Sequence, residues 1–196
     1  MNSKKRIFYV CSYGGSGSKM LCEALKKYGL VEHIHSRYPP DKLEYIGDKN
    51  GGQTYCEWFN GITIPEHELE NYYVIFIYRN PIFSIRSRFT NPKHLEHIQT
   101  DTNIKLKDVL TTEKDLYKIK EFYDNYTKIN KNRNYKIYCI KYEDIFNKQN
   151  ELSNLLNIGE LNLVNKSSRK VPFSKLNIIY EDLINIMNKN KFIMIV

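Results

Sequence analysis

A stretch of glycine, serine and lysine near the start of the chain has the residue types that bind an anion. It reads SYGGSGSK over residues 12–19 and lies between an apolar run and a helical pattern. Glycines let backbone N–H groups approach an anion, and the N-terminus of the following helix adds partial positive charge. The stretch predicts a phosphate-binding loop, although a tight strand–helix turn without a ligand has the same composition. The candidate binding residues are Gly14, Gly15, Ser16, Gly17, Ser18 and Lys19.

The loop departs from two widespread nucleotide-binding patterns. The triphosphatase pattern G-x-x-x-x-G-K-[ST], aligned on Lys19, requires glycine at 13 and 18 and Ser or Thr at 20. The chain has Tyr13, Ser18 and Met20 at these positions. The dinucleotide pattern G-x-G-x-x-G also fails, because Met20 stands where its third glycine is needed. The loop alone therefore leaves open which phosphate ester it binds.

A second candidate anion site follows the apolar run YYVIFIY at 72–78. Arg79 ends this run, and a buried guanidinium is costly unless it meets an anion or a carboxylate. Asn80 is a good N-cap and Pro81 suits the first helical position, so a helix should begin directly after Arg79. Ser87 lies eight residues after Arg79, about two turns into that helix. The two side chains could hold one phosphate; the alternative is a helix-capping arginine at the surface.

Strand and helix patterns alternate along the chain. Strands are expected at 7–11, 30–36, 72–78 and 135–142, and helices at 18–28, from 81 onward, and at 113–133, 144–157 and 174–189. Residues 90–112 look polar and irregular, and the tail KFIMIV is expected to be a buried end segment. The alternation predicts an α/β fold of three layers, a central parallel sheet flanked by helices, in one domain over 1–196. Ligands in such folds bind beyond the carboxyl ends of the strands, where the glycine loop and Arg79 would lie.

Composition limits the partners and the compartment. The chain has 30 Lys and Arg against 22 Asp and Glu, a formal net charge of +8, which suits an anionic ligand, a nucleic acid or an acidic membrane, or is simply a solvated lysine-rich surface. The cysteines, Cys11, Cys22, Cys56 and Cys139, form no CxxC pair, so free thiols in a reducing compartment are expected. No signal-peptide pattern and no apolar run of about 18 residues is found. A cytoplasmic chain is therefore expected.

Several segments resemble the PAPS-dependent sulfotransferases, in the order in which that family has them. SYGGSGSKML resembles the loop that binds the 5′-phosphosulfate, and YRNPIFSIRSRF resembles the element whose Arg and Ser, here Arg79 and Ser87, bind the 3′-phosphate. IKYEDIFNKQNELSNLLNIGE and FSKLNIIYEDLINIMNKN are similar to the Tyr-Glu-Asp segment and the closing helix. SSRKV is similar to an Arg-Lys element that also reaches the 3′-phosphate, which implies this role for Arg169 and Lys170. The resemblance implies a P-loop NTPase-like sulfotransferase fold that uses PAPS, releases PAP, needs no metal and acts on a small-molecule or glycan acceptor.

The segment EHIHSRYPP resembles the family's Lys-Thr-His motif, with His35 on the histidine and His33 on the lysine. The resemblance implies that His35 is the general base, with Glu32 and Glu57 as weaker candidates, and that Lys19 is a second catalytic group. A neutral imidazole can take a proton from an acceptor near pH 7. The alternative is that His33 and His35 are ordinary strand residues on one face.

The chain also departs from the family, and two other functions remain open. Gly14 and Gly15 replace the family's Pro and Lys, Ser18 and Lys19 replace two threonines, and Val171 replaces a glycine. A P-loop kinase could use Glu143 or Asp144 to hold Mg²⁺. A nucleotide- or RNA-binding module could use the basic surface and the tyrosines, but these fall mostly at core positions, which disfavours a nucleic-acid partner. Residues 36–66 and 90–112 are expected to form the lid and the acceptor pocket, with aromatic walls from YCEWF.

Overall fold

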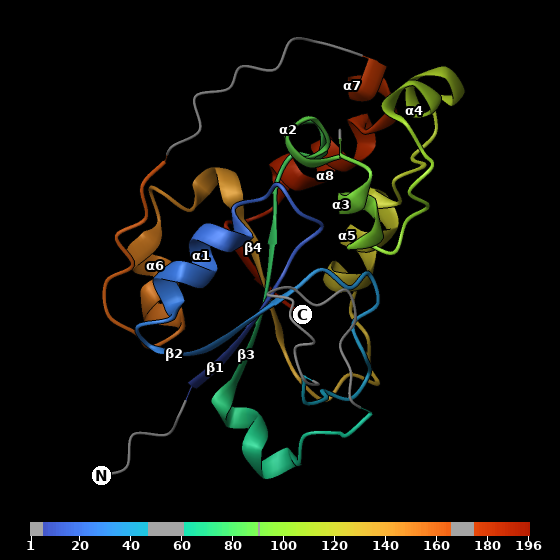
Figure 1. The fold of residues 1–196 in the computed structure, drawn as a ribbon. Coiled ribbons are helices and arrows are strands. Elements are labelled where there is room, and N and C mark those ends of the chain that lie inside the picture. Colours follow the sequence, from blue (N-terminus) through green and yellow to red (C-terminus); the bar gives the residue numbers. More distant parts are fainter. Residues whose placement is uncertain (1–5, 47–60, 90, 166–174) are drawn as a thin grey trace.

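The computed structural model describes residues 6–46, 61–89, 91–165 and 175–196, which are coloured in Figure 1. Cys56, Glu57, Arg169 and Lys170 lie outside these ranges, as does the YCEWF segment. The predicted roles of these residues therefore stay predictions.

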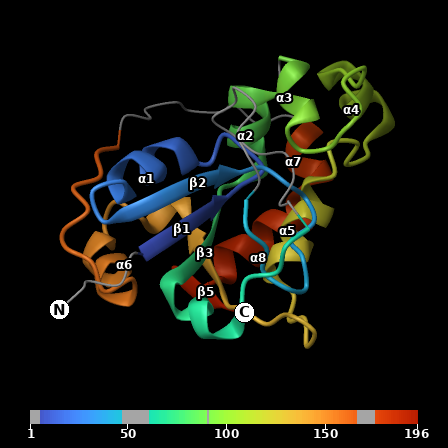
Figure 2. The same cartoon turned by 60° about the horizontal axis from the view of Figure 1, so that its bottom comes forward.

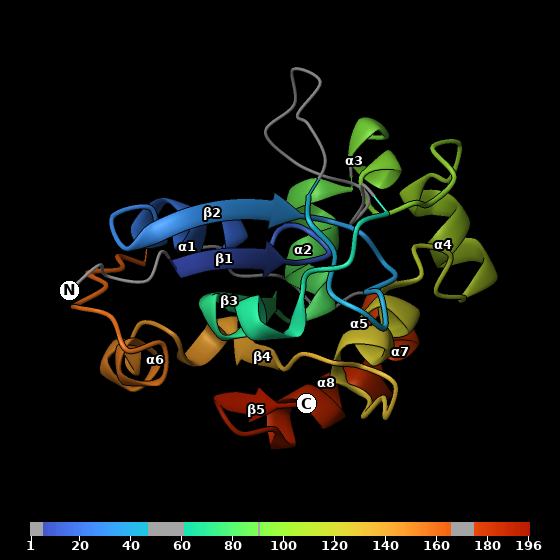
Figure 3. The ribbon, with the colours of Figure 1, turned by 90° about the horizontal axis from the view of Figure 1, so that it is seen from below.

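The described chain forms a five-stranded sheet in the order β2-β1-β3-β4-β5, and Figure 3 shows the strands in this sequence. The strands are β1 (Arg6–Cys11), β2 (Gly29–Ile34), β3 (Tyr72–Tyr78), β4 (Ile137–Lys141) and β5 (Ile193–Ile195). The first four pair in parallel, whereas β5 pairs antiparallel with β4. The sheet is thus mostly parallel, as the predicted central parallel sheet requires for β1 to β4, whereas the antiparallel edge strand β5 was not predicted.

Helices cover both faces of the sheet (Figure 2). The helices are α1 (Ser18–Leu25), α2 (Pro81–Arg88), α3 (Lys93–Glu96), α4 (Leu106–Thr112), α5 (Ile119–Thr127), α6 (Gln149–Leu155), α7 (Lys175–Ile179) and α8 (Glu181–Lys189), with 3₁₀ turns η1 (Glu66–Asn71) and η2 (Tyr142–Asp144). Apolar side chains of α1 and α6 pack with Phe8 and Val10 on one face. Those of α2, α5, α7 and α8 pack with Tyr9 and Cys11 on the other, as expected when successive strand residues point to opposite faces. The predicted α/β architecture is confirmed.

Strand β3 lies at the centre of both packed layers. Its residues from Val74 to Tyr78 are at most 1% exposed, with Ile75 and Ile77 in one apolar cluster and Phe76 and Tyr78 in the other. The continuous apolar run predicted this placement, because a strand covered on both sides lacks polar alternation. The predicted start of α2 is also confirmed: the Asn80 side chain accepts a hydrogen bond from the N–H of Ile82 at 3.0 Å.

Five expectations about the elements were wrong in part. Residues 90–112 contain α3 and α4, and the tail forms β5, whose Ile195 is half exposed. The helix expected at 113–133 is reduced to α5, because Glu113 and Lys118 adopt positive φ angles of 53° and 59° that end a helix. The helix expected at 144–157 is shorter, as α6, and that at 174–189 is divided into α7 and α8 at Tyr180.

The strand order places the two predicted anion elements next to each other. From β1 the chain crosses to β2 on one side, whereas β3 lies on the other side of β1 and leads outward to β4. The loops that follow β1 and β3 therefore leave the sheet in opposite directions, which opens a crevice at their carboxyl ends. These two connections are the glycine loop and the Arg79–Asn80 link (Figure 1). Within the described ranges, no helix is long and apolar enough to cross a membrane.

Candidate functional site

The glycine loop owes its shape to tight packing against two neighbours. Gly14, Gly15 and Gly17 have φ angles of 87°, 66° and 80°, in the left-handed region that glycine adopts without strain. A Cβ atom on Gly15 would lie 2.8 Å from the Cα of Ser84 in α2, and one on Gly17 would lie 2.4 Å from the ring of Tyr142. The glycines thus let the loop fit between α2 and Tyr142, a packing reason that the sequence pattern did not reveal.

The same loop leaves several hydrogen-bond donors available. The N–H of Gly14 donates to Ser12 Oγ at 3.2 Å, but those of Gly15, Ser16 and Gly17 donate to no described residue. The Ser16 hydroxyl is buried and has no partner in the described part of the chain either. Helix α1 begins directly after the loop, so its positive end lies beside these donors. This arrangement has the donors that an anion-binding loop needs.

A cavity of about 560 Å³ lies beside the loop, between α1, β2 and the end of α2. Its basic wall includes Lys19, Lys26 and Arg88. Lys26 pairs with Glu23 at 2.7 Å, whereas Lys19 and Arg88 form no ion pair with any described residue. Partial burial lowers the pKa of Arg88 from its ordinary value. Two cations that pair with no carboxylate in the described part of the chain make this cavity suited to an anion.

The predicted phosphate clamp of Arg79 and Ser87 contacts the glycine loop from two sides. The Arg79 guanidinium lies between the rings of Phe83 and Tyr142, at 4.8 and 4.4 Å, and its Nη1 donates to the carbonyl of Gly15 at 3.4 Å. Ser87 lines the cavity, and its Oγ donates to the Ser84 carbonyl at 3.2 Å. Arg79 is not among the residues that line the cavity. Both residues therefore meet at Gly15, although only Ser87 faces the cavity.

Tyr13 joins the two connections and was not singled out in the sequence. Its hydroxyl accepts from the Arg79 N–H at 2.8 Å and donates to the Arg79 carbonyl. Its ring is fully buried against Phe76 and Phe122, and burial raises the pKa of this hydroxyl well above its ordinary value. Because the bonded atoms belong to the backbone of Arg79, Tyr13 fixes the end of β3 relative to the loop.

His33 in β2 and His35, which follows the end of that strand, lie at the cavity wall in a hydrogen-bonded network. His35 is 1% exposed; its Nδ1 lies 2.5 Å from the Ser12 carbonyl, and its Nε2 has no partner among the described residues. His33 Nε2 lies 2.8 Å from Ser18 Oγ, and the two imidazole rings are 4.5 Å apart. The ring of His97, which follows α3, lies nearly parallel to that of His35 at 6.1 Å. The sequence predicted the strand pair but not His97.

Stability should fall in mild acid because burial lowers the pKa of both histidines, to about 4 for His33 and about 3 for His35. Below the ordinary pKa of about 6.5 the unfolded chain binds protons that the folded chain does not. The free energy of unfolding should then fall with decreasing pH, by up to about 1.4 kcal/mol per pH unit for each histidine. Urea unfolding between pH 7.5 and 4.5 measures this slope.

The matched variants for this experiment are His33→Gln and His67→Gln. Removing His33 should reduce the slope, whereas His67, whose side chain is 82% exposed, should not matter. Equal slopes in both variants would contradict the assignment.

Of the acidic residues considered from the sequence, the three that the structure describes, Glu32, Glu143 and Asp144, do not line the cavity. Glu32 precedes His33 in β2 and so points to the opposite face, and it does not line the cavity. Glu143 accepts from the Asn80 N–H at 2.9 Å, and Asp144 pairs with Lys141 at 3.5 Å. In the described part of the chain, no group of three or more His, Cys, Asp or Glu side chains could hold a metal ion.

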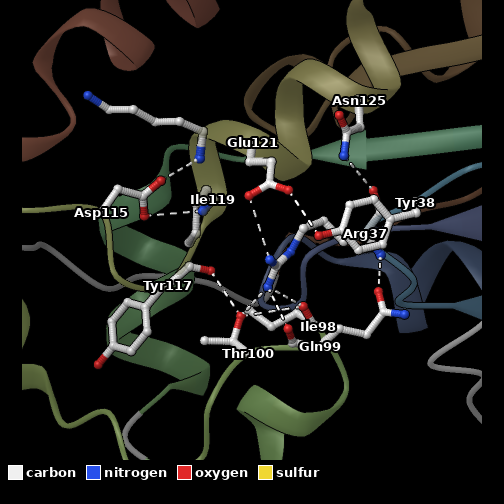
Figure 4. Close-up of polar contacts among 11 residues, drawn as sticks. Arg37, Tyr38, Ile98, Gln99, Thr100, Asp115, Tyr117, Ile119, Glu121 and Asn125 are labelled. Atoms are coloured by element: carbon white, nitrogen blue, oxygen red, sulfur yellow. Dashed lines mark hydrogen bonds and ion pairs between the residues drawn. The ribbon is translucent and has the colours of Figure 1, made fainter.

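Arg37 holds the chain segment that follows His97, and this role was not predicted from the sequence. Its guanidinium donates to the carbonyls of Ile98 and Gln99 at 2.7 and 2.9 Å and to the Thr100 hydroxyl, and it lies 3.7 Å from Glu121 (Figure 4). These acceptors follow His97 directly in the chain, so Arg37 fixes the segment that places the His97 ring. Nothing in the segment SRYPP indicates this role, because all its partners are distant in sequence.

The site thus combines a donor-rich glycine loop, two cations without an ion-pair partner among the described residues, and the pair His33 and His35 at the carboxyl edge of a mostly parallel sheet. A comparison of the chain with protein-family models, with curated proteins and with solved structures finds no match.

Proposed function

We propose that this chain is a sulfotransferase with the P-loop NTPase-like sulfotransferase fold, which binds PAPS and transfers its sulfuryl group to a hydroxyl or amine acceptor. The observation that carries the proposal is the loop after β1. There the N–H groups of Gly15, Ser16 and Gly17 have no described partner, and Lys19 and Arg88, which pair with no carboxylate in the described ranges, offer positive charge beside them. These groups suit a phosphosulfate, because its oxygens accept several hydrogen bonds and the donors are already in place beside the cavity.

The proposed ligands of PAPS form two groups, one for each end of the molecule. The three N–H groups, the Ser16 hydroxyl and Lys19 bind the phosphosulfate. Arg79 and Ser87, which meet at Gly15, bind the 3′-phosphate, and Arg169 and Lys170 are further proposed ligands there. Arg88 adds charge that the sequence did not single out.

Transfer is proposed to proceed by in-line displacement. The bond from sulfur to the donor's phosphate oxygen breaks as a bond from sulfur to the acceptor oxygen or nitrogen forms, and PAP leaves with the bridging oxygen. The acceptor gives its proton to Nε2 of His35, which lines the cavity and has no partner among the described residues. Lys19 and the loop N–H groups stabilise the negative charge on the oxygens in transit. The acceptor is a small molecule or a glycan that enters through the cavity.

Isothermal titration with PAP and with ADP tests the donor assignment. PAP should bind more tightly, because only PAP has a 3′-phosphate for Arg79. The variant Arg79→Ala should weaken PAP binding about ten-fold to a hundred-fold, the effect of losing charge-assisted hydrogen bonds, and should change ADP binding little. The control Arg86→Ala removes an exposed arginine of α2 for which no contact is found among the described residues, and should leave both affinities unchanged.

Equal or absent binding of PAP and ADP would defeat the proposal. Magnesium-dependent consumption of ATP would favour the kinase instead.

A further inference from the structure

A chain of hydrogen bonds links the two histidines through two serines that flank the glycine loop. His35 Nδ1 lies 2.5 Å from the Ser12 carbonyl and 3.3 Å from Ser12 Oγ. Ser12 Oγ lies 2.9 Å from Ser18 Oγ, which in turn lies 2.8 Å from His33 Nε2. Ser12 is completely buried and Ser18 is 4% exposed, so these groups satisfy one another.

The positions of the protons follow from which atoms can donate. A carbonyl oxygen only accepts, so His35 Nδ1 must carry the proton that it shares with Ser12. Ser12 Oγ also accepts from the Gly14 N–H, and its own proton goes to Ser18 Oγ. The proton of Ser18 then goes to His33 Nε2. Among the described residues, the reverse order would leave the Ser12 proton without an acceptor, whereas this orientation gives the protons of both Ser12 and Ser18 an acceptor.

We propose that Ser12 and Ser18 are positioning residues that hold both histidines in fixed neutral tautomers. His35 is protonated on Nδ1 and presents a lone pair at Nε2, the atom without a described partner. His33 accepts at Nε2 and is protonated on Nδ1. The consequence for proton transfer rests on the proposed function, whereas the tautomers themselves do not depend on it.

This assignment changes the role expected for Ser18. A hydroxyl has one proton, and that of Ser18 is used by His33, so it has none to donate to a phosphate. Ser16, whose hydroxyl is buried without a described partner, remains the hydroxyl donor of the loop. Ser16 and Ser18 therefore donate to different groups: Ser16 to the bound anion and Ser18 to His33.

Nitrogen-15 NMR of the histidine rings at pH 7, combined with PAP titration, tests the proposal. In the unchanged chain, His35 should show a protonated Nδ1 and an unprotonated Nε2, and His33 should show the same pattern. The variant Ser18→Ala should move His33 toward the Nε2-protonated form that free histidine prefers, with PAP affinity within about two-fold, and Ser18→Thr should restore the original pattern. Ser16→Ala should do the opposite, lowering PAP affinity about ten-fold with both ring patterns unchanged.

The tautomers can be read even if PAP does not bind, so failure of the proposed function is distinguishable from failure of this inference. A His35 ring protonated on Nε2 in the unchanged chain would overturn it. Unchanged ring patterns in Ser18→Ala would overturn it as well.

Discussion

Replacing Arg37 by alanine is expected to lower the free energy of unfolding by about 3–5 kcal/mol. The residue is 4% exposed and donates to the carbonyls of Ile98 and Gln99 (Figure 4). Leaving a buried acceptor without its donor costs about 1–3 kcal/mol, and the removed side chain leaves a cavity that adds to this cost. Glu121 contributes less, because its carboxylate is 40% exposed and stays hydrated without its partner.

Two further variants complete the experiment: one keeps the charge at position 37, and the other removes an exposed arginine as a control. Arg37→Lys keeps the charge and can place one ammonium among the three acceptors near Nη2, but it lacks the second terminal nitrogen that faces Glu121, so it should recover only part of the loss. Arg86→Ala removes an exposed arginine and should change stability by no more than about 0.5 kcal/mol. Urea unfolding midpoints measure all three, and coinciding midpoints for Arg37→Ala and Arg86→Ala would contradict a supporting role for Arg37.

Features encoded by neighbouring residues could be predicted from the sequence. The buried strand β3 follows from its continuous apolar run, and the start of α2 follows from Asn80 and Pro81, because a cap and a first-turn proline act within a few residues. The placement of the glycine loop at the sheet edge follows from strand–helix alternation. These parts of the site required no knowledge of distant contacts.

Features set by distant partners could not be predicted. Arg37 is buried by acceptors 61 to 63 positions away, and Tyr13 is tied to the backbone 66 positions away. The three residues of β5 form a strand only because β4 offers its edge, and the helix expected at 113–133 begins only at Ile119, after Lys118 takes a positive φ angle. The charge and apolar periodicity of a segment are similar whether or not such distant contacts form, so the sequence pattern alone does not reveal the contacts.

The cavity shows the same division. The loop, Ser87 and His35 were candidates because their types and spacing are local signals. Arg88, adjacent to Ser87, and His97 became visible only once α2 and the segment after α3 had positions in space. A buried polar network depends on how the layers meet, which requires the tertiary structure.

The substitution Gly15→Ala is expected to disrupt both folding and anion binding. The new Cβ would lie 2.7 Å from Ser87 Oγ, which can rotate away, but also 2.8 Å from Ser84 Cα and 3.0 Å from the Ser84 carbonyl, which belong to the helix backbone. Forced separation of loop and helix costs about 1–3 kcal/mol, and the φ angle of 66° adds about 1–2 kcal/mol of strain. PAP affinity should fall at least ten-fold in the fraction that folds, because the loop N–H groups and Ser87 move apart.

Gly61→Ala is the matched control, because Gly61 has a similar φ angle of 72° but, apart from its chain neighbours, no heavy atom of a described residue within 4 Å of its added Cβ. Its free energy of unfolding should therefore fall only by the backbone strain of alanine at a positive φ angle, about 1–2 kcal/mol, and its affinity for PAP should not change. The double variant Gly15→Ala, Ser87→Ala should recover little, because the contact with Ser84 remains. Urea unfolding and titration of the variants decide the cause. If Gly15→Ala and Gly61→Ala lose the same stability, then backbone conformation alone explains the glycine, and the close contact of loop and helix does not hold the site together.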